Sequence, residues 1–282
     1  MKNKWIKIIY FLCNIIFLSC SPNILPKFNQ INTLRVIALT TPTPEVSAGD
    51  TVTVTPVISD INSVTALTYT AQVCIDLGIA YGLMPTCEGN PTRQVIHTNQ
   101  ILTLPGIVDQ WTGNADTFTF VIPSWAAMFS GKSAQDQFNG VNYLVEYILV
   151  NSNGQTVKSF RRIIVSNKTP KNINPNITDF FSNGVSMITL PVGYKVNLTS
   201  DLSASSIEAY QIKDLNNLIT TDNETLSVTW MITDGETKYF RSGLGQANEY
   251  TGPMATPTGR SAYIFALARD NRGGVTVVRK KF

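Results

Sequence analysis

Few side chains in this sequence could carry out catalysis. His97 is the only histidine of the 282 residues, and the residues around it read as a strand. A histidine in that setting is far more often a structural or surface residue than a catalytic base. The chain contains no nucleophile-elbow motif, phosphate-binding glycine loop or zinc-protease helix. We therefore predict a protein that is not an enzyme and binds no cofactor.

Acidic side chains could act in two other ways, as a catalytic pair or as calcium ligands. Paired carboxylates of a glycoside hydrolase are brought together only by folding, so an accessory or unrecognised hydrolase stays open as an alternative. Asp60, Asp76, Asp270 and Asn271 lie near predicted turns, where their oxygen atoms could bind calcium. Asp and Asn more often serve turns through hydrogen bonds to the backbone. We predict no metal site.

The first 19 residues have the pattern of a signal peptide. Lys2, Lys4 and Lys7 precede an apolar run over Ile8 to Leu18. This run has the length of a signal h-region and is short for a membrane span. The chain is therefore expected to be exported.

The apolar run ends in the residues Phe17-Leu18-Ser19-Cys20, which resemble the processing site of bacterial lipoproteins. The resemblance implies that Cys20 is lipidated and becomes the new N-terminus, so that the membrane is a partner through this lipid. Because Ser21 follows the cysteine, similarity to Gram-negative lipoproteins also implies the outer membrane, facing the periplasm or the cell surface. Residues 20–33 would then form the lipidated N-terminus and a tether. Ordinary cleavage after Ser21 is the alternative.

The remaining cysteines predict a disulfide. Cys13 is removed with the signal peptide and Cys20 is taken by the lipid, which leaves Cys74 and Cys87. Two cysteines in an oxidising compartment are typical of a structural disulfide. They lie too far apart for an ordinary redox pair, and with one histidine they do not make a zinc site.

The positive charge of the chain belongs to its signal peptide. The sequence has 22 Lys and Arg against 19 Asp and Glu, and the three signal lysines account for the difference. A neutral chain with 15% charged residues gives no electrostatic basis for binding nucleic acid. The sequence also shows no basic patch for anionic lipid.

Beyond Leu34 the sequence has the pattern of β-strands and turns. Residues 141–165 form the clearest hairpin, with two strand-like runs around an Asn- and Gly-containing turn. Residues 167–178, rich in Pro and Asn, predict a linker. The chain is therefore expected to be all-β, with domains over residues 34–166 and 179–282.

The two halves end alike. A shift of 120 residues places Tyr143 on Tyr263 and aligns the turn and strand that follow. With the residues Pro44 to Asp50, this pattern resembles the tandem Ig-like lipoproteins of Gram-negative bacteria. The resemblance implies two tandem Ig-like β-sandwich domains, with both tyrosines as tyrosine corners and Trp230 in a core.

Domain 1 has a longer segment than domain 2 before its closing hairpin. This insertion includes the loop between the cysteines, Trp111, and a segment with Trp125 and Phe129. Long segments on a rigid sandwich often carry binding residues. These three aromatic residues could contact a partner, or they could instead cover the open end of domain 1.

The sequence therefore favours a membrane-anchored, non-enzymatic binding or adhesion module of the cell envelope. Its partner would be a protein or glycan, bound through the domain 1 insertion. A structural spacer or docking subunit of an envelope assembly, using its edge strands, is the second interpretation.

Overall fold

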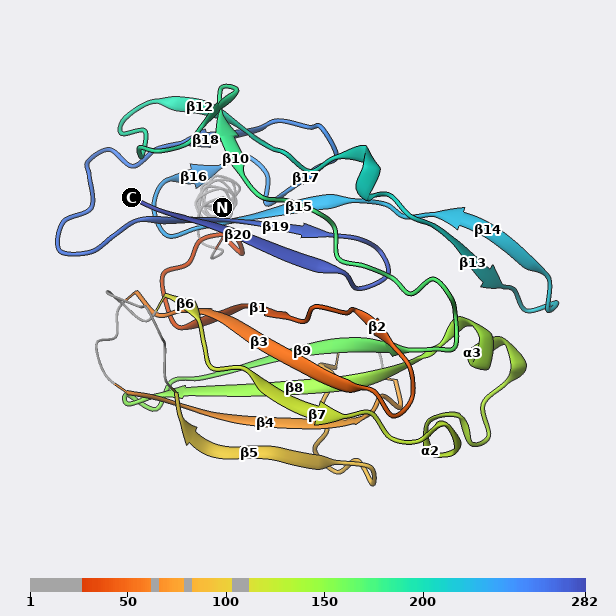
Figure 1. The fold of residues 1–282 in the computed structure, drawn as a ribbon. Helices are drawn as coiled ribbons and strands as arrows, with labels where there is room; N and C mark the ends of the chain where they lie inside the picture. The colour runs from red at the N-terminus through yellow and green to blue at the C-terminus, as the bar shows by residue number, and fades with distance from the viewer. Residues whose placement is uncertain (1–26, 62–65, 79–82, 103–111) are drawn as a thin grey trace, which may run out of the picture.

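The computed structural model describes residues 27–61, 66–78, 83–102 and 112–282, and most of its regular structure is β-strand (Figure 1). Two β-sandwiches follow one another along the chain and lie side by side (Figure 1). Within the described ranges, no helix has the length and apolar character that a membrane crossing needs.

Domain 1 is a sandwich of two sheets. Its strands are β1 (Arg35–Thr40), β2 (Glu45–Val46), β3 (Thr51–Ser59), β4 (Leu67–Ile75), β5 (Gln94–Ile101), β6 (Gly113–Asn114), β7 (Phe118–Val121), β8 (Val141–Asn151) and β9 (Thr156–Val165). In one sheet β3 pairs with β1, β6 and β7, and the other sheet has the order β2-β9-β8-β4-β5. Two short helices, α2 (Trp125–Phe129) and α3 (Ala134–Asn139), precede the β8–β9 hairpin. A chain that alternates between two sheets and closes with a hairpin is typical of the Ig fold.

Domain 2 repeats this plan. Its elements are β10 (Phe180–Ser182), β11 (Val185–Ser186), β12 (Lys195–Ser200), the 3₁₀ turn η1 (Ala204–Ser206), β13 (Ala209–Lys213), β14 (Ile219–Asn223), β15 (Ser227–Ile232), β16 (Glu236–Thr237), β17 (Arg241–Gly243), β18 (Asn248–Thr251), β19 (Tyr263–Arg269) and β20 (Val275–Lys281). The sheets have the orders β11-β10-β12-β18-β16 and β17-β15-β19-β20, and β13 and β14 form a separate hairpin. Trp230 on β15 is fully buried in the core, as predicted. The all-β fold with two tandem Ig-like sandwiches is confirmed.

The closing hairpins of the two domains are equivalent. Their alignment differs by one residue from the alignment predicted from the sequence. Val150 pairs with Thr156 in domain 1, and Arg269 pairs with Val275 in domain 2. Equivalent positions therefore lie 119 residues apart, not 120. A slip of one residue moves a side chain to the other face of a sheet. Tyr143 indeed points into the core of domain 1, whereas Tyr263 points out of domain 2, so the two tyrosines are not equivalent.

The outer face of β19 is buried against domain 1. Phe265 and Leu267 on this face pack with Ile37 and Val57, which lie on the outer face of the β1–β3 pair. The register between β1 and β3 shifts near Ile37, which is consistent with apolar side chains of β1 facing both ways. Both faces of β19 are thus covered, and this explains its unbroken apolar sequence.

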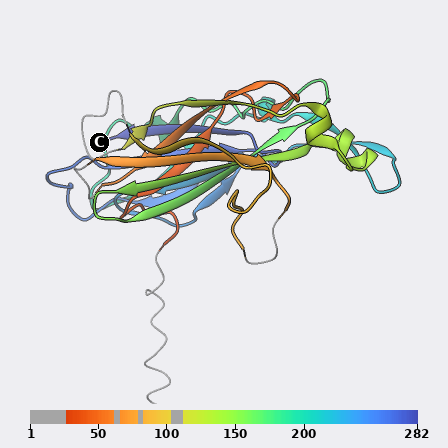
Figure 2. The ribbon, with the colours of Figure 1, turned by 90° about the horizontal axis from the view of Figure 1, so that it is seen from below.

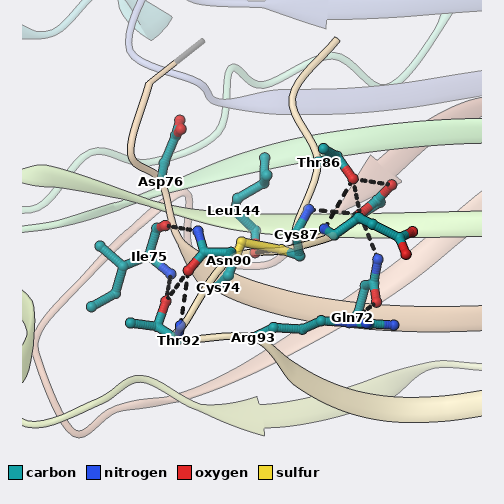
Figure 3. The surroundings of a disulfide bond; sticks show 12 residues. Gln72, Cys74, Ile75, Asp76, Thr86, Cys87, Asn90, Thr92, Arg93 and Leu144 are labelled. Atoms are coloured by element: carbon teal, nitrogen blue, oxygen red, sulfur yellow. Dashed lines mark hydrogen bonds between the residues drawn. A yellow bond between two sulfur atoms is a disulfide. The ribbon is translucent and has the colours of Figure 1, made fainter.

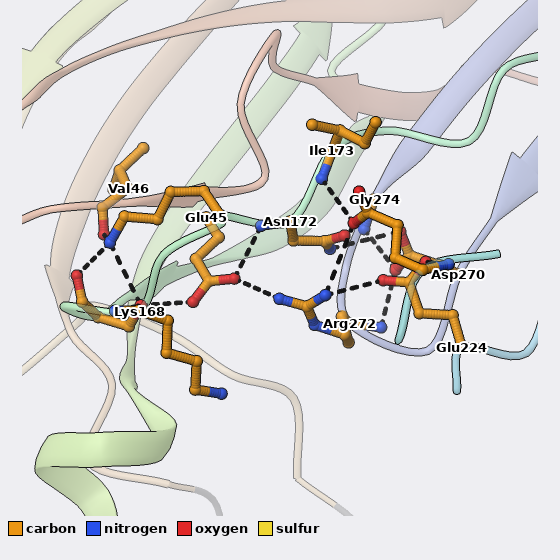
Figure 4. A network of polar contacts seen from close by, with 12 residues as sticks. Glu45, Val46, Lys168, Asn172, Ile173, Glu224, Asp270, Arg272 and Gly274 are labelled. Atoms are coloured by element: carbon orange, nitrogen blue, oxygen red, sulfur yellow. Dashed lines mark hydrogen bonds and ion pairs between the residues drawn. The ribbon is translucent and has the colours of Figure 1, made fainter. Parts of the chain in front are cut away.

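A buried ion network lies at the edge of this interface, and we refer to Glu45, Glu208, Glu224 and Arg272 as the joint (Figure 4). Arg272, from the turn between β19 and β20, donates to Glu45 of domain 1 at 2.5 Å and to Glu224 at 3.1 Å. The backbone N–H of Asn172, in the segment between the domains, donates to Glu45 at 2.9 Å. Each of these buried charges has an opposite partner, as burial requires.

Two further contacts fix the domains together. In α3, the side-chain amide of Asn139 donates to the carbonyl of Lys213 and accepts from its N–H, both at 2.8 Å. Near the start of the described chain, the backbone N–H of Ile31 donates to the carbonyl of Ile232 on β15 at 2.7 Å. The N–H of Ile232 in turn donates to the carbonyl of Asn29 at 2.9 Å. Part of the segment expected to act as a tether, from residue 27 onward, therefore runs along domain 2 before the chain enters domain 1.

Candidate functional site

Glu146 is a buried acid on the outer face of domain 1. Its neighbours Val145 and Tyr147 on β8 point into the core, so Glu146 lies on the opposite, outer face of the sheet. A carboxylate there would ordinarily be solvated, yet Glu146 is buried. The cover is the segment between β4 and β5, whose described parts project from this sheet in Figure 2. We refer to its described parts, residues 76–78 and 83–93, as the disulfide loop.

Glu146 accepts hydrogen bonds from the disulfide loop and from Gln72 on β4. Its carboxylate accepts from the Thr86 hydroxyl at 3.0 Å, from the backbone N–H of Cys87 at 2.8 Å and from the Gln72 amide at 2.6 Å. The Gln72 carbonyl oxygen in turn accepts from Arg93 at 2.6 Å. Hydrogen bonds to an ionised acceptor are among the stronger ones in proteins. One charged side chain therefore fastens the loop to the sheet.

The predicted disulfide is confirmed. Cys74, near the end of β4, is bonded to Cys87 with the two Cα atoms 5.7 Å apart (Figure 3). Both cysteines pack on Leu144, on the outer face of β8. A crosslink that closes a loop of this size stabilises the fold by about 3 kcal/mol. The bond lies outside the sandwich core and braces the loop rather than the two sheets.

Polar side chains complete the attachment of the loop. The Asn90 amide donates to the carbonyl of Ile75 and the Thr92 hydroxyl accepts from its N–H, both at 2.9 Å. Arg162 on β9 pairs with Asp76 at 2.5 Å. Both strands that flank β8 thus contribute, and the described parts of the loop are fixed before any partner binds.

The loop presents apolar side chains to solvent. Leu77, Leu83 and Met84 are 66%, 64% and 60% exposed. Met84 also borders a pocket of about 400 Å³ between the loop and β9. Its lining residues are Met84, Pro85, Thr86, Glu88, Glu146, Lys158, Ser159 and Phe160. We call the three apolar residues and this pocket the loop surface. Exposed apolar side chains on a rigid support are typical of a protein-binding surface.

The aromatic residues proposed from the sequence are placed differently. Phe129 is only 4% exposed and belongs to the core of domain 1, so its side chain cannot serve as a partner contact. Trp125 is half-buried and stacks on Phe129 with their ring centroids 3.7 Å apart. Ser124 caps their helix, and its hydroxyl accepts from the N–H of Ala127. Trp111 and Cys20 lie outside the described residues.

Much of the expected insertion builds the sandwich itself. Strands β6 and β7 pair with β3, and Phe118, Phe120 and Met128 fill the core. Strand β6 has only two residues and is too short to leave a strand pattern in the sequence. Among the described parts of the insertion, the disulfide loop projects from its sheet (Figure 2).

His97 has a structural environment. It is half-buried on β5, with its ring centroid 5.4 Å from Tyr69 and 6.2 Å from Phe118, both edge-on. Within the described ranges, no group of three His, Cys, Asp or Glu side chains is arranged to hold a metal ion. The acids considered for calcium have other contacts: Asp76 pairs with Arg162, and Asp270 accepts from backbone N–H groups of its own turn.

A second hollow lies where the two domains meet. Its volume is about 520 Å³, and its walls are Phe138, Asn167, Lys168, Thr169, Pro170, Lys171, Glu208, Ala209, Tyr210, Gln211, Thr221 and Arg272. The cations here are engaged within the chain: Arg272 belongs to the joint and stacks over Tyr210, and Lys171 donates to the carbonyl of Val46. The hollow is therefore best explained as part of the domain contact.

Burial shifts the pKa of two groups near this hollow. It raises the pKa of Glu224 to about 7, and the charge of Asp270 adds to the shift. It lowers the pKa of Lys168, which faces the ring of Phe138. The raised pKa of Glu224 predicts that the joint responds to pH through this carboxyl group.

The role of Glu146 is not evident from the sequence alone. A single acid within the apolar run from Tyr143 to Val150 was the available signal, since it marks the outer face of a strand. That face would ordinarily be solvated, so the pattern could not show that a loop covers it.

No known family profile matches the chain, and no curated protein matches it. Among solved structures, the two tandem V-type regions of VCBP3, a v-region-containing chitin binding protein, are 11% identical, with a TM-score of 0.27 over 88% of this chain and 97% of that one. The FN1–FN3 domains of chicken CNTN1 are 7% identical, with a TM-score of 0.22 over 87% of this chain and 63% of that one.

Two larger proteins were also matched. Red sea bream transglutaminase is 10% identical, with a TM-score of 0.26 over 88% of this chain. Dimeric latent PorU from Porphyromonas gingivalis is 11% identical, with a TM-score of 0.26 over 89% of this chain. The chain spans 31% and 24% of these two proteins, respectively. At such identities and scores, none of the four similarities informs function.

Proposed function

We propose that this protein is a lipid-anchored, non-enzymatic binding module of the cell envelope and that its partner is a protein held by the loop surface. The anchor is the acylated Cys20, and the location is the outer membrane. The observation that carries the proposal is the fixed disulfide loop, with Leu77, Leu83 and Met84 exposed on it.

The support comes from the cost of ordering. A flexible loop loses conformational freedom on binding, whereas a loop that is already held loses little. Glu146, the disulfide and the Asp76–Arg162 pair impose this order in the free protein. A protein that acts only as a spacer does not require exposed apolar residues on a loop that is held in place. The aliphatic character of these residues favours a protein over a glycan, because sugars bind best to aromatic ring faces.

The packing of the domains favours the spacer as the second candidate. The apolar interface of Phe265 and Leu267 and the ions of the joint hold the two sandwiches in one arrangement, as a rigid spacer would require. This interpretation leaves the loop surface without a role. It therefore predicts that changes at the loop surface have no effect on assembly.

The test is site-specific photo-crosslinking in intact cells of the native bacterium. A photoreactive residue replaces Leu83 on the loop surface, and the control replaces Leu218, which is exposed to a similar degree in the hairpin β13–β14 of domain 2. We expect a discrete crosslinked protein at position 83, lost on L77S/M84S, and none at position 218. Equal crosslinking at both positions, or a product unaffected by L77S/M84S, would argue for the spacer.

Deletion of the insertion is not a suitable test. Removing residues 112–140 would take Phe118, Phe120 and Met128 out of the core, so lost binding would report unfolding. Mass spectrometry of the mature N-terminus tests the anchor separately. An unmodified N-terminus at Pro22 would contradict lipidation at Cys20.

A further inference from the structure

A second exposed surface lies where the described chain begins. Phe28, Tyr239 and Phe240 are 62%, 56% and 50% exposed. The rings of Phe28 and Phe240 meet edge-on with centroids 6.2 Å apart, although the two residues are far apart in sequence. Large aromatic side chains exposed side by side are unusual on a protein surface that faces only water.

Cations surround these rings. Arg35 lies 5.4 Å from the ring centroid of Phe28, Arg241 5.5 Å from that of Phe240, and Lys238 5.3 Å from that of Tyr239. We call the three aromatic residues, these three cations and Lys27 the aromatic-basic patch.

The acids near the patch neutralise only part of its charge. Glu236 pairs with Lys27, and Glu249 pairs with Lys195 at 2.8 Å. Within the described part of the chain, Arg35, Lys238 and Arg241 form no salt bridge. The patch therefore combines exposed aromatic rings with an excess of positive charge.

The position of the patch relates it to the N-terminus. Lys27 is the first described residue, and the contacts of Asn29 and Ile31 with Ile232 hold the following residues on domain 2. Seven peptide units separate Cys20 from Lys27, and at full extension they span about 25 Å. A lipid on Cys20 would therefore keep the patch within about this distance of the bilayer.

We propose that the aromatic-basic patch is the membrane-facing surface of this protein and contacts anionic phospholipid headgroups. The inference rests on the proposed acylation of Cys20, which brings the patch to the bilayer. Aromatic rings partition to the membrane interface, and nearby Lys and Arg are attracted to anionic lipid.

The contact would also set the orientation of the molecule. The two domains are joined through the apolar interface residues Phe265 and Leu267 and through Arg272, so a patch that lies on the membrane orients the whole protein. The loop surface would then be presented at one constant angle. The acylated chain alone would permit rotation.

The test measures amide hydrogen exchange of the full mature protein on vesicles. One set contains phosphatidylglycerol and phosphatidylcholine, and the other contains only phosphatidylcholine. We expect several-fold slower exchange over residues 27–29 and 238–241 on the anionic vesicles alone. The exposed tip of the hairpin at residues 214–218 is the internal control and should exchange equally on both.

Matched variants decide the outcome. K238Q/R241Q should abolish the protection, whereas K132Q/K158Q, which removes the same charge from domain 1, should retain it. Unfolding curves establish that each variant is folded. Equal exchange on both vesicle types, protection at the hairpin tip as well, or protection that survives K238Q/R241Q would overturn the proposal.

The anchor and the patch are tested independently. If mass spectrometry shows an unmodified N-terminus, the lipid anchor fails, and the unacylated protein is then titrated with the same vesicles. Salt-sensitive binding to the anionic vesicles, weakened roughly 30-fold by loss of the two cations, would support the patch without the anchor. Absence of such binding would overturn the patch as well.

Discussion

The closing hairpins of the two domains have the same backbone and opposite surroundings. On the outer face of β8, Glu146 accepts hydrogen bonds from the disulfide loop of its own domain. The equivalent position on β19, 119 residues later, is Phe265, which packs against domain 1. One face is thus covered by a polar attachment within the domain and the other by an apolar attachment between domains.

The difference shows how one fold can produce a fixed pair from two similar units. An apolar outer face must be covered, so domain 2 requires domain 1. A carboxylate on the same face attracts hydrogen-bond donors, so domain 1 holds a loop there. Domain 1 is left with a surface that is free for a partner.

Replacing Phe265 should give the largest effect. F265A removes a ring that is fully buried between the domains, and a change of this kind costs about 3–5 kcal/mol. Urea unfolding followed by tyrosine fluorescence and circular dichroism measures it. F160A, on the exposed face of β9, is the control and should cost less than about 1 kcal/mol. Similar losses for the two variants would show that the interface does not stabilise the pair.

Loss of the disulfide should come next. C74A/C87A releases the loop and should cost about 3 kcal/mol, chiefly because the unfolded chain becomes freer. Limited proteolysis should then cut within residues 76–93, and hydrogen exchange in domain 2 should not change. Unchanged resistance to proteolysis would mean that Glu146 and the other polar contacts hold the loop without the disulfide.

How far the sequence predicts this molecule depends on the range of the interaction. Alternating strands, the hairpin turn and the buried Trp230 are local patterns, and they were predicted. The disulfide followed from the cysteines that remained after export. The register of the repeat was missed by one residue because both faces of β19 are apolar, and such a strand has no alternation to fix its face.

Long-range contacts explain the remaining errors. Phe129 was a candidate partner contact, yet its side chain lies in the core of domain 1, as the alternative interpretation allowed. The aromatic-basic patch joins Phe28 to Phe240, so no window of sequence contains it. Lys238 to Arg241 are consecutive, but the fold is needed to bring Phe28 and Arg35 to them.

Glu146 tests the polar half of the comparison. E146A leaves the N–H of Cys87 and the side chains of Gln72 and Thr86 without their acceptor, at a cost of about 1–3 kcal/mol. E146Q keeps one acceptor oxygen and should cost less. Urea unfolding measures both. If E146A is as stable as the parent, the loop is held by the disulfide and the other polar contacts.

The joint should make the attachment of the domains depend on pH. Burial raises the pKa of Glu224 to about 7, above its ordinary value, so the folded state binds a proton more tightly than the unfolded state. Its contribution to stability is therefore greatest at low pH and falls as the pH rises toward about 7. We expect the free energy of unfolding, relative to E224Q, to fall by about 1–2 kcal/mol between pH 5 and pH 8. A constant difference would mean that Arg272 keeps Glu224 ionised throughout.

The turns of the two hairpins should respond alike, because they are the part that the domains share. Asn151 accepts from the N–H groups of Asn153 and Gln155, at 3.1 and 2.9 Å, through its side-chain oxygen. Asp270, 119 residues later, accepts from the equivalent groups of its own turn, both at 2.7 Å. N151A and D270A should therefore each cost about 1 kcal/mol.

Exchange of the two side chains is the control for these turns. N151D and D270N keep the accepting oxygen and should each stay within about 0.5 kcal/mol of the parent in urea unfolding. A much larger loss for D270A than for N151A would show that Asp270 acts mainly through the neighbouring joint. Equal losses would establish that the hairpins share one turn, and that their difference lies only in what covers the strand before it.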